Sequence, residues 1–398
     1  MNADRLMPHA SRLSHVDLAI VGGGPVGMSL ALALRHSGLS VALLEARDRL
    51  AVTDPRALAL SQGTRLILER LDAWDGLAAT AIDSIHVSHR GGLGRAELRA
   101  ADAGVPALGY VAEYGDLYAA LATRLPDCGA TLLTGARVVS VRATSGYGAV
   151  GFRRGDDEHL LTAGLVVLSE GGGSLPAELR RDKDYGQSAV VASVDSERPH
   201  AGRAYERFTP EGPIALLPLG EPGGHRYALV WTTPGDQVEA RLALSDADFL
   251  ASLQAAFGDR QGRFLASGAR AAFPLKLHLA APSTSPRLLR IGNAAHVLHP
   301  VAGQGFNLGV RDAWKLAEAI LDTPPARLGE ADLARRYAQS RRLDVAGGSL
   351  MTDLLVEAFS NDHFVARHAR GAALALLDLT PPLKTLFARK MMFGARTW

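Results

Sequence analysis

Short, nearly continuous apolar runs recur along the chain and predict the buried strands of a parallel sheet. The runs cover residues 16–21, 40–44, 165–168 and 288–292. Runs of this length without alternation are typical of strands that are covered on both faces. A helical spacing of apolar residues follows the first run at residues 28–38 and the last run at residues 307–320. A strand followed by a helix in this way predicts an α/β protein with a Rossmann-like domain.

The pattern changes in the middle of the chain to alternating apolar and polar residues. Four such segments lie between residues 189 and 231, with Pro and Gly turns between them, and residues 82–98 alternate in the same way. A period of two predicts antiparallel strands with one covered face, whereas only helical patterns follow residue 332. We therefore expect three regions. They are a discontinuous nucleotide-binding domain (1–80, 100–180 and 280–330), an inserted antiparallel β-sheet domain (81–99 and 181–279) and a helical C-terminal region (331–398).

Length and composition narrow the class of protein. With 398 residues and 47% hydrophobic content, the chain is long enough for two or three interleaved domains. The 43 basic and 41 acidic residues nearly cancel and no long basic run occurs, so we expect no nucleic-acid partner. Cys128 is the only cysteine, which fits a reducing compartment. The sequence has neither a signal-peptide pattern nor an apolar run of about 18 residues, so we expect a cytoplasmic protein and leave peripheral membrane contact open.

A glycine-rich turn directly follows the first strand. Gly22, Gly24 and Gly27 form the pattern GxGxxG. In a strand–turn–helix unit the first glycine permits a tight turn, the second lets the backbone approach a pyrophosphate, and the third lets the helix lie close to its strand. Glu45 ends the second strand, where an acid accepts hydrogen bonds from an adenosine ribose. The alternative is a turn whose glycines serve only packing.

A second loop rich in glycine and proline lies between residues 290 and 312, RIGNAAHVLHPVAGQGFNLGVRD. Pro300 ends a segment of small residues, and Gly303 and Gly305 leave the loop free to take positive φ before a helix that we expect to begin at Asn307. Such a loop directs several N–H groups and a positive helix dipole at one point. A helix N-terminus whose glycines serve only close packing is the alternative.

Arg56 lies in a segment from Thr53 to Ser61 that we expect to be a loop leading into a helix. Its guanidinium could neutralise a phosphate or cover a flat ring. It could equally be a surface arginine paired with Asp54. Both interpretations remain open at the level of the residues.

Together these motifs resemble the FAD-dependent aromatic hydroxylases related to p-hydroxybenzoate hydroxylase, and in particular the UbiH-like hydroxylases of ubiquinone biosynthesis. Three motifs appear in the family's order: GxGxxG at residues 22–27, the pair Glu170-Gly171, and Gly292-Asn293 continued by HPVAGQGFNLGVRD. The resemblance covers nearly the whole chain, including DPRALALS and GRAYERFTPEGPIALLPL. The family more usually has aspartate at positions 170 and 293. Asn293 can still hydrogen-bond a ribityl hydroxyl, and Glu170 keeps the charge but reaches further.

The resemblance implies non-covalently bound FAD as cofactor and a flavin C4a-hydroperoxide, formed with dioxygen, as the hydroxylating species. It implies that N–H groups of Gly305, Phe306 and Asn307 stabilise the anionic reduced ring. No catalytic side chain is assigned: for His296 and His299 we favour structural hydrogen bonding over proton transfer, and no third residue indicates a metal site. The reductant is NAD(P)H or another donor. The implied cofactor-binding residues are Gly22, Gly24, Pro25, Val26, Gly27, Glu45, Arg47, Arg56, Val138, Asn293, Pro300, Gly303, Gly305, Phe306 and Asn307.

The resemblance also implies a polyprenylated phenol as substrate. Residues 214–219, IALLPL, offer aliphatic side chains and no fixed cation, whereas a benzoate-type substrate needs an arginine for its carboxylate. Arg203 or Arg207 would overturn this expectation if either pointed into the pocket. The alternatives are a hydroxylase of a soluble aromatic compound and a non-catalytic flavoprotein scaffold in a biosynthetic complex.

The C-terminal segment 376–398, LLDLTPPLKTLFARKMMFGARTW, places Leu, Phe and Met residues beside cations. This composition predicts peripheral contact with a membrane or a partner enzyme. The alternative is that these apolar residues simply close the core.

Overall fold

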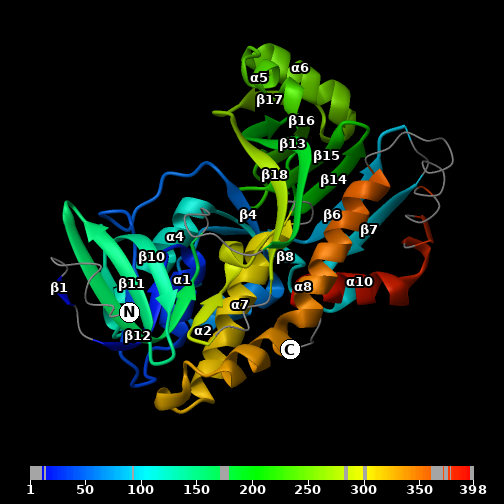
Figure 1. Ribbon diagram of the computed structural model, residues 1–398. Coiled ribbons are helices and arrows are strands. Elements are labelled where there is room, and N and C mark those ends of the chain that lie inside the picture. Colours follow the sequence, from blue (N-terminus) through cyan, green and yellow to red (C-terminus); the bar gives the residue numbers. More distant parts are fainter. Residues whose placement is uncertain are drawn as a thin grey trace.

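The computed structural model describes residues 11–12, 15–91, 94–170, 179–281, 286–298, 303–359, 371, 375–376 and 378–394, with the backbone alone at 11–12, 179–180, 182 and 349–359. Figure 1 shows an α/β part at the lower left, a β-rich part above it, and the C-terminal helices along the right side. The α/β fold class with an inserted sheet is therefore as the sequence predicts, and the inserted sheet is antiparallel except that the strands at 203–209 and 84–89 run parallel to each other. No helix in the described part of the chain is long and apolar enough to cross a membrane.

An eight-stranded sheet forms the α/β part. Its order is β10-β11-β12-β2-β3-β9, and β1 and β19 also pair with β12. The strands β19, β12, β2, β3 and β9 run parallel, whereas β10, β11 and β12 form an antiparallel meander. The bounds are β1 Ser11–Arg12, β2 Val16–Val21, β3 Val41–Leu44, β9 Thr131–Leu133, β10 Arg137–Ala143, β11 Gly148–Arg154, β12 Asp157–Leu168 and β19 Leu288–Arg290.

Both faces of the parallel strands are covered, which explains their continuous apolar sequences. Leu18 and Ile20 of β2 are buried in a cluster with residues of the helices. Ala19 and Val21 are buried on the other face, in a cluster with residues of the meander. The helices of this part are α1 Pro25–Ala33, α2 Gln62–Arg70, α4 Tyr114–Ala122 and α7 Gln304–Leu321.

A nine-stranded sheet forms the β-rich part, in the order β20-β18-β13-β16-β15-β14-β6-β7, with β17 paired to β13. Its strands are β6 Ser84–His89, β7 Arg95–Arg99, β13 Leu179–Ser196, β14 Arg203–Thr209, β15 Gly212–Pro218, β16 Arg226–Pro234, β17 Phe264–Ser267, β18 Ala271–Ala280 and β20 His296–Val297. Strand β20 comes from a segment that the sequence analysis assigned to the nucleotide-binding domain. The boundaries of the three regions therefore stay a prediction.

One face of this sheet is packed against helix α6 (Asp246–Phe257), which follows the short helix α5 (Val238–Leu242). The sheet residues Ile214, Leu216 and Trp231 are buried together with Phe249 and Phe257 of α6. Alternate residues of the same strands therefore point the other way, toward the α/β part.

The remaining elements connect the two sheets. A three-stranded sheet has the order β4-β8-β5, and α10 contacts α2, α3 and β4. The bounds are β4 Ala57–Ser61, β5 Ala79–Ile82, β8 Gly109–Glu113, α3 Ala100–Ala103, α8 Ala331–Phe359 and α10 Pro381–Phe393. Short 3-10 turns lie at Leu125–Asp127, Gly235–Gln237, Asp259–Gln261, Gly292–Ala294 and Pro325–Arg327.

Candidate functional site

The three glycines of the first turn have different surroundings. Gly22 has φ of 109°, and a Cβ there would lie 2.9 Å from the backbone nitrogen of Glu170. A Cβ on Gly27 would lie 2.0 Å from the carbonyl oxygen of Gly22, so the helix α1 packs directly on the turn. Gly24 precedes α1 and has no heavy atom within 4 Å of an added Cβ. Gly22 and Gly27 therefore serve internal packing, and Gly24 presents an open backbone beside Pro25 and Val26, which line the same cavity.

Glu45 closes this turn from the end of β3. Its Oε2 accepts a hydrogen bond from the N–H of Gly23 at 2.9 Å, and its Oε1 accepts from the N–H and the Nε of Arg47, both at 2.9 Å. Burial raises the pKa of Glu45, but the hydrogen bonds and charge of Arg47 outweigh it, and the pKa lies below its ordinary value. Tyr118, which the sequence analysis missed, donates to the carbonyl of Gly23 at 3.0 Å and lies under the Arg47 guanidinium.

The second loop differs from the expectation in where the helix begins. Helix α7 starts at Gln304, three residues before Asn307, and its N-cap Gly303 has φ of 60°. The positive φ that we expected at both glycines is therefore at Gly303, whereas Gly305 already has helical backbone. A Cβ on Gly303 would lie 3.0 Å from Cβ of Ala59, but a Cβ on Gly305 would meet no atom within 4 Å. Gly305 is thus the open position of this loop.

The side chain of Asn307 is fully used in positioning the loop. Its Oδ1 accepts hydrogen bonds from the N–H of Ser61 at 2.8 Å and the hydroxyl of Thr64 at 2.7 Å. Its Nδ2 donates to the carbonyls of Ala59 at 2.8 Å and Gly303 at 2.7 Å. These bonds tie the N-terminus of α7 to β4 and α2. The sequence analysis did not identify Ser61 and Thr64 as part of the site. The signal for them was their spacing, which is typical of a helix N-cap: the Ser61 hydroxyl accepts a hydrogen bond from the N–H of Thr64.

Arg56 combines the two interpretations that the sequence left open. Its guanidinium forms an ion pair with Asp54 at 2.5 Å. The same group lies 5.2 Å from the ring centroid of Tyr114 and 4.8 Å from that of Phe273 on β18, and the residue lines the cavity. Arg56 therefore connects the α/β part to the β-rich part, and its charge is balanced there.

A buried network of charges lies beneath both loops. Asp312 of α7 accepts hydrogen bonds from the N–H of Gly292 at 3.0 Å, the Nε2 of His296 at 2.5 Å and the Nε of Arg341 at 2.7 Å. Burial raises the pKa of Asp312, but the charges of His296 and Arg341 hold it well below the usual range. Asp344 pairs with Arg341 at 2.6 Å. His296 is thus a structural hydrogen-bond partner, and the network fixes the turn that carries Asn293.

The other implied cofactor residues have varied positions. Asn293 is exposed and lines the cavity, as does the half-buried Phe306. Val138 lies on β10 and packs against the meander, away from the residues that line the cavity. Pro300 lies outside the described residues, and so does His299.

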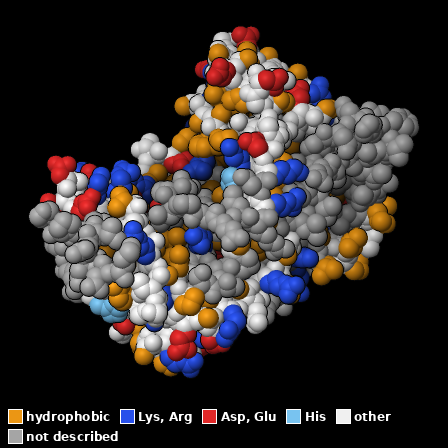
Figure 2. Space-filling view, in the orientation of Figure 1, with side chains coloured by type: hydrophobic (Ala, Val, Ile, Leu, Met, Phe, Trp, Pro, Cys, Tyr) orange, Lys and Arg blue, Asp and Glu red, His pale blue; other side chains and the backbone are white. Residues whose placement is uncertain are grey.

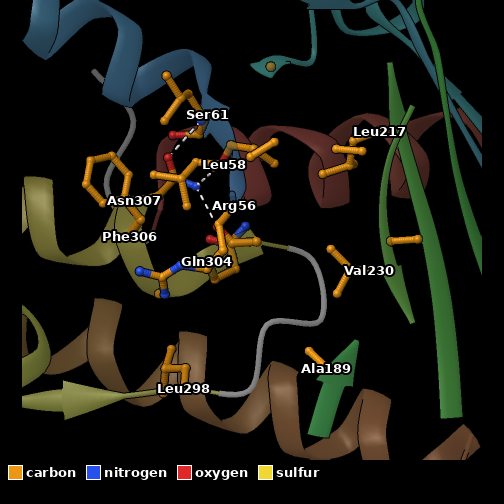
Figure 3. A pocket seen from close by; sticks show the side chains of 18 of the residues that line it. Arg56, Leu58, Ser61, Ala189, Leu217, Val230, Leu298, Gln304, Phe306 and Asn307 are labelled. Carbon is orange, nitrogen blue, oxygen red and sulfur yellow. Dashed lines mark hydrogen bonds between the residues drawn. The ribbon is translucent and has the colours of Figure 1, made fainter. Parts of the chain in front are cut away.

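One cavity of about 740 Å³ connects Gly24, the N-terminus of α7 and the nine-stranded sheet. Figure 3 shows Gln304, Phe306 and Asn307 on one side of it and Leu217 and Val230 on the other. Of the IALLPL segment, Ala215 and Leu217 line the cavity, whereas Ile214 and Leu216 are buried on the opposite face with α6. The sheet wall that faces α7 is therefore mainly apolar.

Arg203 and Arg207 do not line the cavity. They alternate on β14 with Ala204, Glu206 and Phe208, which do. Arg203 pairs with Glu97 at 3.3 Å, and Arg207 donates to the hydroxyl of Ser88 at 3.4 Å. Within the described part of the chain, the charged residues that line the cavity are Arg56 and Glu206.

The sequence profile of the FAD binding domain family matches residues 15–346. The chain is 37% identical over 390 residues to the ubiquinone hydroxylase UbiL of Rhodospirillum rubrum, an alignment that covers 94% of this chain and 89% of that protein. The chain belongs to the FAD-dependent hydroxylases of ubiquinone biosynthesis. This hydroxylase is also 28% identical over 384 residues to the 3-demethoxyubiquinol 3-hydroxylase of Escherichia coli, with coverage of 92% and 96%.

The fold of the hydroxylase agrees with a solved structure. The p-nitrophenol 4-monooxygenase PnpA of Pseudomonas putida matches it with a TM-score of 0.77 at 18% identity, covering 97% of the hydroxylase and 100% of that chain. At this identity the likeness concerns the fold alone. The resemblance inferred from the motifs and the assignment as an FAD-dependent monooxygenase are confirmed by the family match and the relatives.

The residues of the hydroxylase fit FAD. Gly24 and Gly305 line the cavity and have open space where a Cβ would lie. The first N–H groups of α1 and α7 have no acceptor within their own helices, and the positive ends of both helix dipoles favour anionic groups. When bound, FAD supplies the redox chemistry that no side chain can perform. The atoms that each implied residue presents to FAD stay a prediction.

Proposed function

We propose that this hydroxylase acts on the ring of a polyprenylated phenol, with the ring between the N-terminus of α7 and the sheet wall and the prenyl chain along the apolar part of that wall. The observation that carries the proposal is the cavity: of the two charged residues described in its lining, Arg56 is already paired with Asp54. A benzoate would need a cation for its carboxylate. A prenyl chain gains about 0.8 kcal/mol for each buried CH₂.

The roles of the chain in this proposal are binding and orientation. The backbone at Gly24 and the first N–H groups of α7 hold the cofactor, while Ala215, Leu217 and Val230 contact the substrate and exclude water. The electrons come from NADH or NADPH, or from another reductant.

The test compares substrates on the purified, FAD-loaded protein. We expect a short-chain prenylphenol to be hydroxylated with coupled oxidation of NADH or NADPH, and 4-hydroxybenzoate not to be, as measured by mass spectrometry of the product. Chemically reduced enzyme mixed with oxygen and the prenylphenol covers the case of a different electron donor. Hydroxylation of 4-hydroxybenzoate alone would point to a soluble aromatic substrate. No product from either compound in the chemically reduced enzyme would point to a scaffold.

We further propose that α10 contacts an anionic lipid surface. Leu383 and Leu386 lie on one side of this helix and are 44% and 65% exposed, Leu379 just before the helix is 80% exposed, and Arg389 and Lys390 are exposed further along it. Figure 2 shows hydrophobic side chains at the right edge of the molecule, over α10. Apolar residues next to cations favour the membrane interface. The other side of α10 lines the cavity with Phe387 and Met391, so a lipid-borne substrate lies one helix away from its site.

Replacing both Leu383 and Leu386 by Glu is expected to lower binding to vesicles that contain phosphatidylglycerol by at least about tenfold, because the apolar contact is lost. Flotation of the protein with vesicles measures this. Leu265→Glu, at a 55% exposed leucine on β17, is the matched control and should bind as the wild type does. Equal flotation of all three proteins would leave α10 with a purely structural role.

A further inference from the structure

Glu206 is a carboxylic acid that faces the cavity from the centre of its sheet wall. It lies on β14 between Tyr205 and Arg207, and its neighbours in register are Ala215 on β15 and Val87 on β6. Both neighbours line the cavity and neither can form a side-chain hydrogen bond. The side chain of Glu206 keeps some accessible surface, and because the residue lines the cavity, this surface faces its interior.

Within the described part of the chain, no group forms a hydrogen bond or an ion pair with the Glu206 carboxyl, and burial is the sole cause that raises its pKa to about 7. The charged side chains on the same and neighbouring strands do not face this carboxyl. Arg203 and Arg207 lie on the opposite face of the sheet, as does His86, whose pKa is lowered to about 4 by burial. The Tyr205 hydroxyl is bonded to Gln261 at 2.6 Å.

The groups across the cavity leave the carboxyl equally free. Arg56 is paired with Asp54 and lies over the ring of Tyr114. Helix α10 contributes the apolar Phe387 and Met391. An unpaired carboxyl in an apolar cavity is costly for folding, and such groups are concentrated at functional sites, where a ligand supplies the missing partner.

We infer that Glu206 is a catalytic base that accepts the proton of the substrate's phenolic hydroxyl; this rests on the proposed phenolic substrate. The carboxylate first accepts a short, charge-assisted hydrogen bond from the hydroxyl. The phenolic O–H bond then breaks, a new O–H bond forms on the Glu206 carboxyl, and the electron pair stays on the phenolate oxygen. The ring gains electron density for attack by the electrophilic oxygen. Oxygen transfer forms a ring C–O bond, and the ring C–H bond then breaks, its proton leaving with the water that a monooxygenase releases. Glu206 returns its own proton to the phenolate oxygen, so the total charge of the carboxyl and the substrate does not change.

The matching of acidities supports this role. A phenol has a pKa of about 10, and a base works best when its own pKa lies near the working pH. An ordinary glutamate is too weak a base for a phenol, whereas burial brings the pKa of Glu206 to about 7. The position in the apolar wall therefore makes the carboxyl more basic without a second side chain.

The test compares Glu206→Gln with Glu206→Asp and with the control Glu97→Gln, which removes a carboxyl from β7 of the same sheet that is paired with Arg99 and does not line the cavity. We expect Glu206→Gln to lower kcat by about 10²-fold or more with FAD content unchanged. Its pH profile should lose the limb near pH 7 that the wild type shows. Glu206→Asp should keep that limb at reduced rate, and Glu97→Gln should match the wild type.

A second readout does not depend on turnover. The dissociation constant of a short-chain prenylphenol is measured on oxidised, FAD-loaded enzyme from pH 6 to pH 9, a range in which the free phenol stays neutral because its pKa is about 10. We expect binding to change through about pH 7 in the wild type, because the Glu206 carboxyl must be ionised to accept the phenolic hydrogen bond, and to be independent of pH in Glu206→Gln. Glu206→Gln should fold, since it removes a buried charge. Wild-type kcat and a wild-type pH dependence of binding in this variant would overturn the inference. Failure of the wild type on every prenylphenol would instead contradict the proposed substrate, and the same comparison would then use the phenol that is turned over.

Discussion

Gly305→Val is expected to lose FAD almost completely while the chain remains folded. Gly305 lies in the first turn of α7, has helical backbone, and has no heavy atom within 4 Å of an added Cβ. The Cβ of a valine there would meet no other atom of the protein within 4 Å, and valine is a better helix former than glycine. Its side chain enters the cavity at the point where we expect the backbone to approach the flavin ring. The ratio of flavin to protein absorbance after purification measures the loss, and urea unfolding of the apoprotein measures the fold.

Gly27→Val is the matched comparison, because it makes the same change in the other glycine motif. A Cβ on Gly27 lies 2.0 Å from the oxygen of Gly22 and 2.6 Å from the hydroxyl oxygen of Ser169. This variant should unfold at lower urea concentration or fail to accumulate, whereas Gly305→Val should not. If Gly305→Val retained its full flavin content, the ring would lie elsewhere in the cavity.

Asp312→Asn is expected to lower the free energy of unfolding of the apoprotein by about 3–5 kcal/mol, the usual cost of breaking a buried ion pair. Asp312 is almost fully buried and accepts from Gly292, His296 and Arg341. Removing its charge leaves Arg341 partly uncompensated in the interior. FAD content should fall as well, because the network fixes the turn that carries Asn293. Urea unfolding followed by tryptophan fluorescence measures the first effect.

The surface pair Arg327–Glu330 provides the control. Its side chains are 57% and 45% exposed, and exposed pairs contribute about 0–1 kcal/mol, so Glu330→Gln should change stability little. The contribution of Asp312 also has a predictable pH dependence. Its folded pKa is lowered, so the stabilisation is complete above about pH 4, the pKa in the unfolded chain, and decreases as the pH falls further. Equal stability of Asp312→Asn and wild type at pH 7 would contradict the proposed importance of the network.

The two glycine-rich turns beside the cavity were predictable from the sequence, because both depend on backbone positions that lack a side chain. The spacing of Gly22, Gly24 and Gly27 between a strand and a helix records which positions must lack a Cβ. The error at Gly305 has a simple cause. A helix can begin in glycine-containing sequence when a polar side chain holds its first turn, and Asn307 does so through four hydrogen bonds.

The substrate half of the site was harder to predict from the sequence, because the residues that line it depend on which face of each strand points into the cavity. In the sequence Arg203-Ala204-Tyr205-Glu206-Arg207, nothing local distinguishes the arginines from the acid as cavity residues. The register of β14 with β15 and β6 decides it. The network of Asp312 was missed for a similar reason, since its partner Arg341 lies on α8 and the pairing depends on how α7 and α8 pack.

The long pairing of β13 with β18 limits how the cavity can open. The two strands are paired from Leu179 and Ala280 to Val191 and Ala271, and Figure 1 shows them running from the upper sheet down to the α/β part. A hinge between the two parts would have to bend both strands of this ladder together. We therefore expect substrate to enter and product to leave through movements of smaller elements, such as α10, rather than by separation of the two parts. Substitutions in the sheet wall should then change which phenol is accepted without lowering the affinity for FAD.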